Sequence, residues 1–283
     1  LAIEMAKHFG TEIISCDSRQ FFKEMKIGTA TPTDEELAQA KHHFIGHLSV
    51  QDYYSIGQYE EDALEKIEEI FEKNDFAVLV GGSMMYEKAA VEGLNDLPEA
   101  NAENQEKLQK ILDEEGLEKL QEILKNLDEE YYNVVHKENP RRLLRAIDVI
   151  WQTGRKYSEI IAEPKHKRDF KVIRIGITAP REIMYERINL RVDKMLEKGL
   201  IDEVKSLTKY QKLVPLQTVG YTEIFKYLEG TWDLDFAIEE IKKNSRRYAK
   251  RQETWNRKVE NVTWLPYDYS EEQLHEILSK IEK

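Results

Sequence analysis

An alternation of strand and helix patterns near the start of the chain constrains its fold most. Residues 11–15 form a short β-branched run, residues 56–74 repeat apolar side chains at helical spacing, and residues 76–80 are continuously apolar. Strand, helix and strand in that order are typical of a parallel sheet with helices on its faces. We therefore predict an α/β fold built on a parallel sheet flanked by helices.

A long helical stretch interrupts this pattern. After Pro98 the sequence is rich in Glu, Lys and Leu, and strand patterns return only at residues 172–177 and 262–265. We predict a discontinuous α/β core of residues 1–98 and 169–283, which carries an all-helical insertion of residues 99–168.

Capping residues mark the ends of two helices. Residues 1–10 have the pattern of an amphipathic helix that ends at Gly10, and because no capping residue precedes them we expect further residues upstream. In the insertion, Asn139 is the expected N-cap of a helix with Pro140 in its first turn and an end near Gly154.

Charge and cysteine content exclude several classes of function. The formal net charge of −12 argues against binding of a polyanion over the whole surface, so a nucleic-acid site must be a local basic patch. The single cysteine, Cys16, excludes an internal disulfide and suits a reducing cytoplasm. We expect no nucleophilic role for it, because no His partner can be assigned. No apolar run approaches membrane-spanning length, so we expect no membrane partner.

Two predicted strands lead into candidate functional turns. Asp17 follows the first strand, where open α/β sheets place ligands, and its carboxylate could accept a proton from an attacking amine. Its spacing from Gln20 also fits a helix-capping box, which we favour from spacing alone. Gly81, Gly82 and Ser83 follow the second strand and could let backbone amides approach an anion, although turn geometry explains the glycines equally well.

A cationic row is expected on one predicted helix. Arg187, Arg191, Lys194 and Lys198 have i, i+4, i+7, i+11 spacing, which places them along one helix face. Such a row could hold a diphosphate and stabilise it as it leaves, but a solvated surface face is the more common explanation.

The strongest anomaly in composition is the segment of residues 241–258, which holds eight basic residues and one acidic residue in an acidic chain. A helical wheel puts Ile241, Tyr248 and Trp255 on one side and the basic residues on the opposite half. We interpret it as a helix packed on the core whose outer face meets phosphates.

A second basic patch lies on the insertion. Arg141, Arg142 and Arg145 should be exposed, because the apolar side chains of that helix point the other way. Together the two patches could grip an extended polyanion such as RNA. The histidines of residues 42–47 have no Cys or carboxylate at ligand spacing, so we interpret His42, His43 and His47 as ordinary packing or surface residues.

Segments in a specific order resemble the tRNA dimethylallyltransferase family over essentially the whole chain. The matching segments are EIISCDSRQ (12–20), KIGTATPT (26–33), KHHFIGHLS (41–49), VGGSMMY (80–86), NPRRLLRAIDV (139–149), RINLRVDKML (187–196), LQTVGYTEI (216–224) and RRYAKRQETW (246–255). The resemblance implies a core like that of the phosphate-binding-loop (P-loop) NTPases. It also implies transfer of a dimethylallyl group from its diphosphate to the exocyclic N6 amine of an adenine beside the tRNA anticodon.

The resemblance also implies roles for individual residues. By similarity, Asp17 is the general base, and Arg187 and Arg191 bind the diphosphate, with Mg²⁺ sharing its charge. The substrate channel would include Thr29, Gly81, Gly82, Ser83 and Tyr86. The anticodon stem-loop of tRNA would contact Asp17, Ser18, Arg19, Gln20, Arg141, Arg142, Arg145, Gln217, Thr218, Val219, Gly220, Tyr221, Lys250, Arg251, Gln252, Thr254, Trp255 and Arg257. The target adenine would flip out of its stack to reach the diphosphate. A cytoplasmic monomer is expected.

Three positions depart from the family pattern. The loop G-x-x-x-x-G-K-S/T, where Mg²⁺ is expected, would lie immediately before Leu1 and is not among these residues. Ser83-Met84-Met85 stands where many members have Thr-Gly-Leu, which puts bulkier side chains near the channel. Thr31 occupies a position that is often Lys, so one phosphate contact could be lost.

Three alternatives remain open from the sequence. A P-loop small-molecule kinase would share the core and the arginine-bearing helix but would not need the basic segment of residues 241–258. A prenyltransferase acting on free adenine nucleotides would not need the basic insertion. A non-catalytic RNA-binding module would not need Asp17 together with Arg187 and Arg191.

Overall fold

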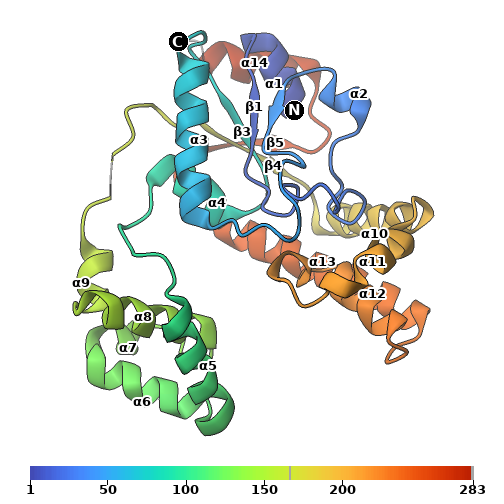
Figure 1. Ribbon diagram of the computed structural model, residues 1–283. Helices are drawn as coiled ribbons and strands as arrows, with labels where there is room; N and C mark the ends of the chain where they lie inside the picture. Colours follow the sequence, from blue (N-terminus) through green and yellow to red (C-terminus); the bar gives the residue numbers. More distant parts are fainter. Residues whose placement is uncertain (166, 282–283) are drawn as a thin grey trace. The chain divides into compact units, whose positions relative to one another are not determined.

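In a computed structural model, which describes residues 1–165 and 167–281, the chain separates into two units (Figure 1). Unit 1 comprises Leu1–Val91 and Phe170–Lys283, and unit 2 comprises Glu92–Asp169. The chain therefore leaves unit 1, forms a separate body and returns to unit 1.

The strands of unit 1 form two parallel sheets. In the first, β1 (Ile13–Ser15) lies between β2 (His42–His43) and β3 (Val78–Val80), and in the second β4 (Arg174–Thr178) pairs with β5 (Val262–Pro266). The α/β prediction is confirmed. The strand β2 was not expected, because a His-His pair carries none of the β-branched pattern that marks the other strands.

Helices cover both faces of the first sheet. Successive side chains of a strand point to opposite faces, and here Ile13 packs with Ala6 of α1 (Ala2–Phe9). Its neighbour Ile14 packs with Ile67 and Ile70 of α3 (Ile56–Phe71), which runs alongside the strands in Figure 1. The helix α1 ends at Gly10 in the left-handed region, as predicted, and Ser55 begins α3 with a capping box.

A cavity of 570 Å³ lies between the two sheets. Its walls include Val80 of β3, Ile173 just before β4, and Ile177 and Trp264 of β4 and β5. These four side chains are 40–51% exposed, so each leaves much of its apolar surface uncovered in the structure.

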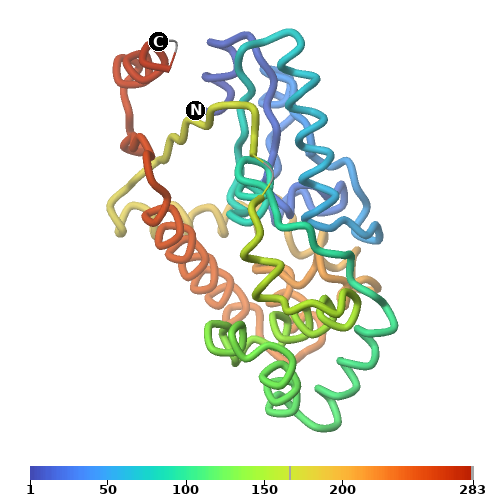
Figure 2. The backbone as a smooth tube through the Cα atoms, turned by 90° about the vertical axis from the view of Figure 1, so that its left-hand side faces the viewer, coloured from blue at the N-terminus to red at the C-terminus, as the bar shows by residue number. Residues whose placement is uncertain are grey.

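A large apolar core in unit 1 includes Val192 of α10 (Arg181–Glu197), Val204 of α11 (Leu200–Ser206), Tyr221 of α12 (Tyr221–Leu228) and Ile241 of α13 (Leu234–Asn256). The remaining elements of this unit are α2 (Asp34–Leu37), α4 (Met84–Glu92), α14 (Glu271–Ile281) and two 3-10 turns at Thr208–Tyr210 and Val214–Leu216. Figure 2 shows the red end of the chain running from α13 through β5 to α14. Within the described part of the chain, no helix is both long enough and apolar enough to span a bilayer.

Unit 2 is helical throughout its described elements. It consists of α5 (Ala102–Glu115), α6 (Leu117–Leu127), α7 (Glu129–Val134), α8 (Pro140–Thr153) and α9 (Tyr157–Ala162). The helix α8 begins and ends as predicted: Asn139 accepts from the Arg142 amide, and Gly154 adopts a left-handed conformation. Its buried face, with Leu143, Ala146 and Ile147, forms the centre of this unit's core.

Candidate active site

The turn after β1 carries the candidate base. Residues 18–20 form a turn rather than the start of a helix, and the Asp17 Oδ1 atom accepts a hydrogen bond of 3.0 Å from the Arg19 amide. The Gln20 side chain donates to the carbonyl oxygens of Thr29 and Ala30, at 3.2 Å each. The capping-box interpretation of Asp17 and Gln20 is therefore wrong, and Asp17 stands at the carboxyl end of the strand without capping a helix.

The turn after β3 packs against the turn that carries Asp17. Because β1 and β3 are parallel, their carboxyl ends meet at the same edge of the sheet. The Ser83 hydroxyl accepts from the Ser18 amide at 3.0 Å and lies 2.9 Å from the Ser18 hydroxyl. A Cβ atom on Gly81 would lie only 2.6 Å from Cys16 and 2.7 Å from the Asp17 nitrogen, so the close approach of the two turns requires glycine there.

The helix α13 contacts the turn after β3 at this edge of the sheet. The Tyr248 hydroxyl and the Gln252 side-chain amide both donate to the Gly82 carbonyl, at 3.2 and 2.8 Å. Burial raises the pKa of Tyr248, and the nearby Asp17 carboxylate raises it further. The Tyr248 hydroxyl therefore lies within electrostatic reach of Asp17, and Gln252, an expected tRNA contact, donates to Gly82.

The helix α10 brings a cation to the same place. The Arg191 Nη2 atom donates to the Thr29 carbonyl at 3.4 Å. Desolvation lowers the pKa of Arg191, and the negative charge of Asp17 opposes this effect, which places the two groups within electrostatic reach. One turn earlier, the Arg187 guanidinium lies 5.7 Å from the centre of the Tyr267 ring. Lys194 continues the row as an exposed side chain.

Two of the residues expected in the substrate channel have buried or partly buried side chains. Thr29 is 7% exposed, its hydroxyl donates to the Met25 carbonyl, and it lies 3.0 Å from the Thr31 hydroxyl. The Tyr86 ring packs against Phe21 and Tyr59, and burial raises its pKa. Thr29 can therefore offer its backbone carbonyl to the site, but not its hydroxyl group.

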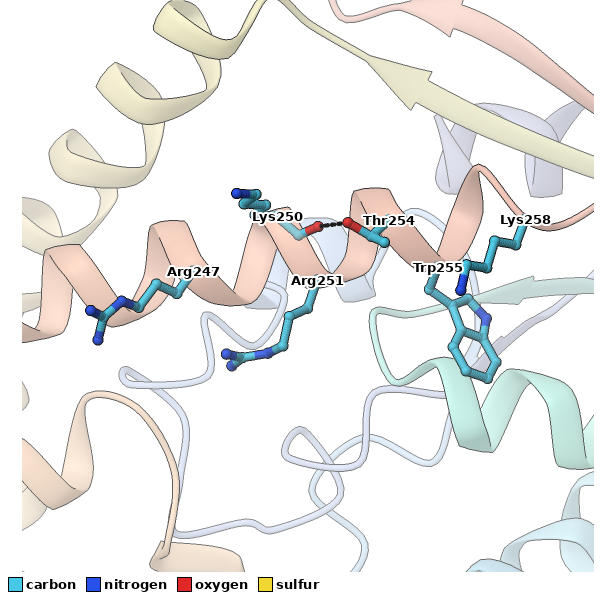
Figure 3. A pocket seen from close by; sticks show the side chains of 6 residues that line it. All are labelled: Arg247, Lys250, Arg251, Thr254, Trp255 and Lys258. Atoms are coloured by element: carbon cyan, nitrogen blue, oxygen red, sulfur yellow. Dashed lines mark hydrogen bonds between the residues drawn. The ribbon is translucent and has the colours of Figure 1, made fainter. Parts of the chain in front are cut away.

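Part of the predicted basic face is exposed. Figure 3 shows the open hollow of 390 Å³ along α13, which is lined by Arg247, Lys250, Arg251, Thr254, Trp255 and Lys258. Arg247, Arg251 and Trp255, which have i, i+4, i+8 spacing, leave the helix on the same side in this view. The helical-wheel prediction that Trp255 lies opposite the basic residues is therefore wrong.

The helical-wheel prediction is wrong for two other cations of α13. Lys242 forms an ion pair of 2.8 Å with Asp193, and Arg246 donates to Asn189 at 2.7 Å. Both partners belong to α10, so these two cations join helices. Arg257 is exposed and pairs with Glu253 one turn before it.

The segment of residues 217–221 lies partly inside unit 1. Tyr221 is fully buried and Gly220 is buried, so their side of the segment supports the core, contrary to the expected contact of Tyr221 with tRNA. Gln217 is exposed, while Thr218 and Val219 are partly exposed. The Tyr221 hydroxyl donates to Glu203 at 2.6 Å. No sequence motif marks Glu203, whose one acidic neighbour on α11 is Asp202.

Of the three arginines of α8 that were predicted to be exposed, two are exposed. Arg141 and Arg142 lie on the surface of α8, as predicted. Arg145 was also expected to be exposed, but its guanidinium donates to the Pro98 carbonyl at 2.6 Å and lies 3.5 Å from the buried Asp148 carboxylate. It therefore has a structural role in this unit.

The other reactive side chains have structural surroundings. His43 pairs with Glu12, and His47 packs its ring against Phe21 and Phe44. Among residues 1–165 and 167–281, no three His, Cys, Asp or Glu side chains gather into a possible metal site. Burial raises the pKa of the Cys16 thiol, which leaves it a poor nucleophile.

Comparison with known proteins identifies the family. The model of the IPP transferase family matches residues 20–259. The tRNA dimethylallyltransferases of Christiangramia forsetii and Flavobacterium psychrophilum are 49% and 45% identical to this chain, and each alignment covers 99% of the chain and 93% of the relative.

Solved structures agree with the sequence relatives. The tRNA isopentenylpyrophosphate transferase of Bacillus halodurans is 34% identical with a TM-score of 0.73, over 99% of this chain and 90% of that one. A eukaryotic dimethylallyltransferase that acts on tRNA is 25% identical with a TM-score of 0.85, over 99% of this chain and 75% of its own. The chain belongs to the IPP transferase family, whose named relatives are tRNA dimethylallyltransferases.

Proposed function

We propose that Asp17, Arg187 and Arg191 carry the chemistry of this chain, which by its family is a transferase that dimethylallylates tRNA. The observation that carries the proposal is the placement of Arg191 within electrostatic reach of Asp17 at the carboxyl ends of β1 and β3. An acid and a cation at one edge of the sheet suit a reaction that releases a proton and an anion together.

The reaction can be written with named groups. The N6 amine of an adenine attacks C1 of dimethylallyl diphosphate, a C–N bond forms, and the C–O bond to the diphosphate breaks. The Asp17 carboxylate accepts the proton that leaves N6. Arg191 and Arg187, which occupy one face of α10, stabilise the charge that develops on the departing diphosphate.

Mg²⁺ remains an expectation from the family resemblance. When bound, it would share the charge of the diphosphate. Within residues 1–165 and 167–281 no three His, Cys, Asp or Glu side chains gather, and no step is assigned to the ion.

The exposed cations supply the proposed tRNA surface. Arg247, Lys250, Arg251 and Lys258 line the hollow on α13, and the Arg251 guanidinium lies 5.5 Å from the centre of the Tyr248 ring. Cations of this kind contact phosphates, and Trp255 offers a ring on which an unstacked base of the anticodon loop could lie. The exposed Arg141 and Arg142 of the insertion would add a second contact. The proposal places the chain in the cytoplasm as a monomer.

Replacement of Asp17 tests the base. Asp17→Ala should abolish transfer, while the dissociation constant for tRNA stays within about twofold, because the phosphate-binding cations are unchanged. Asp34→Asn, on the surface helix α2, is the matched control and should keep full activity. Unimpaired turnover by Asp17→Ala would remove Asp17 from the mechanism. Equal turnover of free adenosine monophosphate and tRNA by the unaltered chain would favour the free-nucleotide alternative.

A further inference from the structure

The carboxylate of Glu203 is the most heavily hydrogen-bonded acidic group near the site. Its Oε2 atom accepts from the amides of Lys26 and Ile27, at 2.9 and 2.7 Å. Its Oε1 atom accepts from the Gly28 amide at 2.9 Å and from the Tyr221 hydroxyl at 2.6 Å. Four donors from two distant segments therefore converge on one side chain of α11.

Consecutive backbone amides that point to one spot form a concavity that attracts anions. In this loop the anion is the chain's own carboxylate, so the three amides are occupied and unavailable to a substrate phosphate. Tyr221 completes the arrangement as a fully buried donor, because burial raises the pKa of its hydroxyl and keeps it protonated.

Gly28 makes this convergence sterically possible. A Cβ atom on Gly28 would lie 2.5–2.7 Å from the ring and hydroxyl of Tyr221. The loop therefore lies directly against the Tyr221 side chain, and its position depends on α12 as well as on α11.

The same loop ends in the catalytic neighbourhood. Thr29, the residue after Gly28, accepts from Gln20 at 3.2 Å and from Arg191 at 3.4 Å through its carbonyl oxygen. Gln20 belongs to the turn of Asp17. One carbonyl thus joins the turn that holds the proposed base to the cation proposed to receive the diphosphate.

We infer that Glu203 is a positioning residue, which holds residues 26–28 so that the Thr29 carbonyl keeps Arg191 beside the Asp17 turn. This inference rests on the proposed roles of Asp17 and Arg191. Glu203 acts through the loop and touches neither substrate. Its loss should therefore affect the use of dimethylallyl diphosphate more than the binding of tRNA.

The test compares Glu203→Gln with Asp202→Asn in the full chain. Gln keeps the size of Glu but replaces one acceptor oxygen by an NH₂ donor, so at least one of the two donor pairs meets another donor. Asp202 is the exposed neighbour on the same helix, and its variant makes the same change in charge. We expect Glu203→Gln to lower kcat/KM for dimethylallyl diphosphate by about 10- to 100-fold, the loss typical of a small misplacement. The dissociation constant for tRNA should change by less than about twofold, and Asp202→Asn should match the unaltered chain in both.

Hydrogen exchange gives a readout independent of turnover. The amides of Lys26, Ile27 and Gly28 should exchange faster in Glu203→Gln, while those of β1 and β3 keep their protection. If Glu203→Gln does not fold, Tyr221→Phe tests the inference in its place, because this variant removes one of the four donors to Glu203 and keeps the aromatic ring. It should lower kcat/KM for dimethylallyl diphosphate by a few-fold and leave tRNA binding unchanged.

Two results would overturn the inference. One is an unchanged kcat/KM in Glu203→Gln, or in Tyr221→Phe where that variant decides, whether or not the loop amides exchange faster. The other is a loss that affects tRNA binding and the diphosphate substrate equally and follows a lower melting temperature, because that pattern describes general destabilisation. If neither the unaltered chain nor Asp202→Asn transfers the dimethylallyl group, the proposed function is refuted instead. Activity of these two proteins therefore distinguishes a failure of the proposed function from a failure of the inference about Glu203.

Discussion

Gly81→Ala should damage catalysis through the backbone. The added Cβ would lie 2.6 Å from Cys16, at both its carbonyl carbon and its Sγ atom, and 2.7 Å from the Asp17 nitrogen. An ordinary contact needs 3.4 Å, so the two turns must separate by about 0.8 Å. Overpacking of this size costs about 1–3 kcal/mol of unfolding free energy. A displacement of nearly 1 Å at Asp17 should lower kcat by about 100-fold.

Urea unfolding and single-turnover transfer measure the two effects separately. Gly57→Ala is the control, because Gly57 lies in α3 and an added Cβ would make only an ordinary contact of 3.7 Å with the Ser55 hydroxyl. This variant should be neutral or should stabilise the chain by up to about 1 kcal/mol. Adding Cys16→Ala to Gly81→Ala removes the sulfur but not the backbone carbon, so activity should stay low. Full turnover by Gly81→Ala, or its complete restoration by Cys16→Ala, would refute the idea that the added methyl group pushes the Asp17 backbone.

Three further outcomes are expected. Replacing Lys250 and Arg251 by Ala should weaken tRNA binding and reduce the slope of log K against log salt by about 0.9 per lost phosphate contact on the duplex-DNA scale. The control is Lys73→Ala, at an exposed lysine just after α3, and a slope equal to that of the control would exclude Lys250 and Arg251 from the interface. The Cys16 thiol should resist a disulfide reagent at pH 8 until urea unfolds the chain, because burial raises its pKa; rapid stoichiometric reaction of the folded protein would contradict this. Asp148→Ala should lower the unfolding free energy by about 1–3 kcal/mol, since its buried carboxylate satisfies several donors, and an unchanged melting temperature would argue against that role.

The features that sequence predicted well depend on local chemistry. The caps of α8 need only Asn139, Pro140 and Gly154, and the strands β1 and β3 need only their apolar runs. The order of strand and helix then predicts a parallel sheet, because short connections leave few other topologies.

The features that sequence missed depend on distant partners. A helical wheel shows only its own helix, so it could not reveal that Lys242 and Arg246 face Asp193 and Asn189 of α10. Spacing could not separate a capping box from the turn at Asp17, because in both an Asp carboxylate accepts a nearby amide. No pattern in the sequence points to Glu203, because its hydrogen-bond partners lie in two other segments of the chain.

The hydrogen bonds from α13 to the Gly82 carbonyl have a consequence for discrimination between acceptor substrates. The helix that presents Arg251 to the solvent is fastened, through Tyr248 and Gln252, to the turn beside the proposed base. If tRNA binds this helix as proposed, an acceptor that fits poorly and displaces the helix would also displace the turn beside Asp17. Discrimination between correct and incorrect acceptors should then appear in the speed of the chemical step as well as in how tightly each one is held.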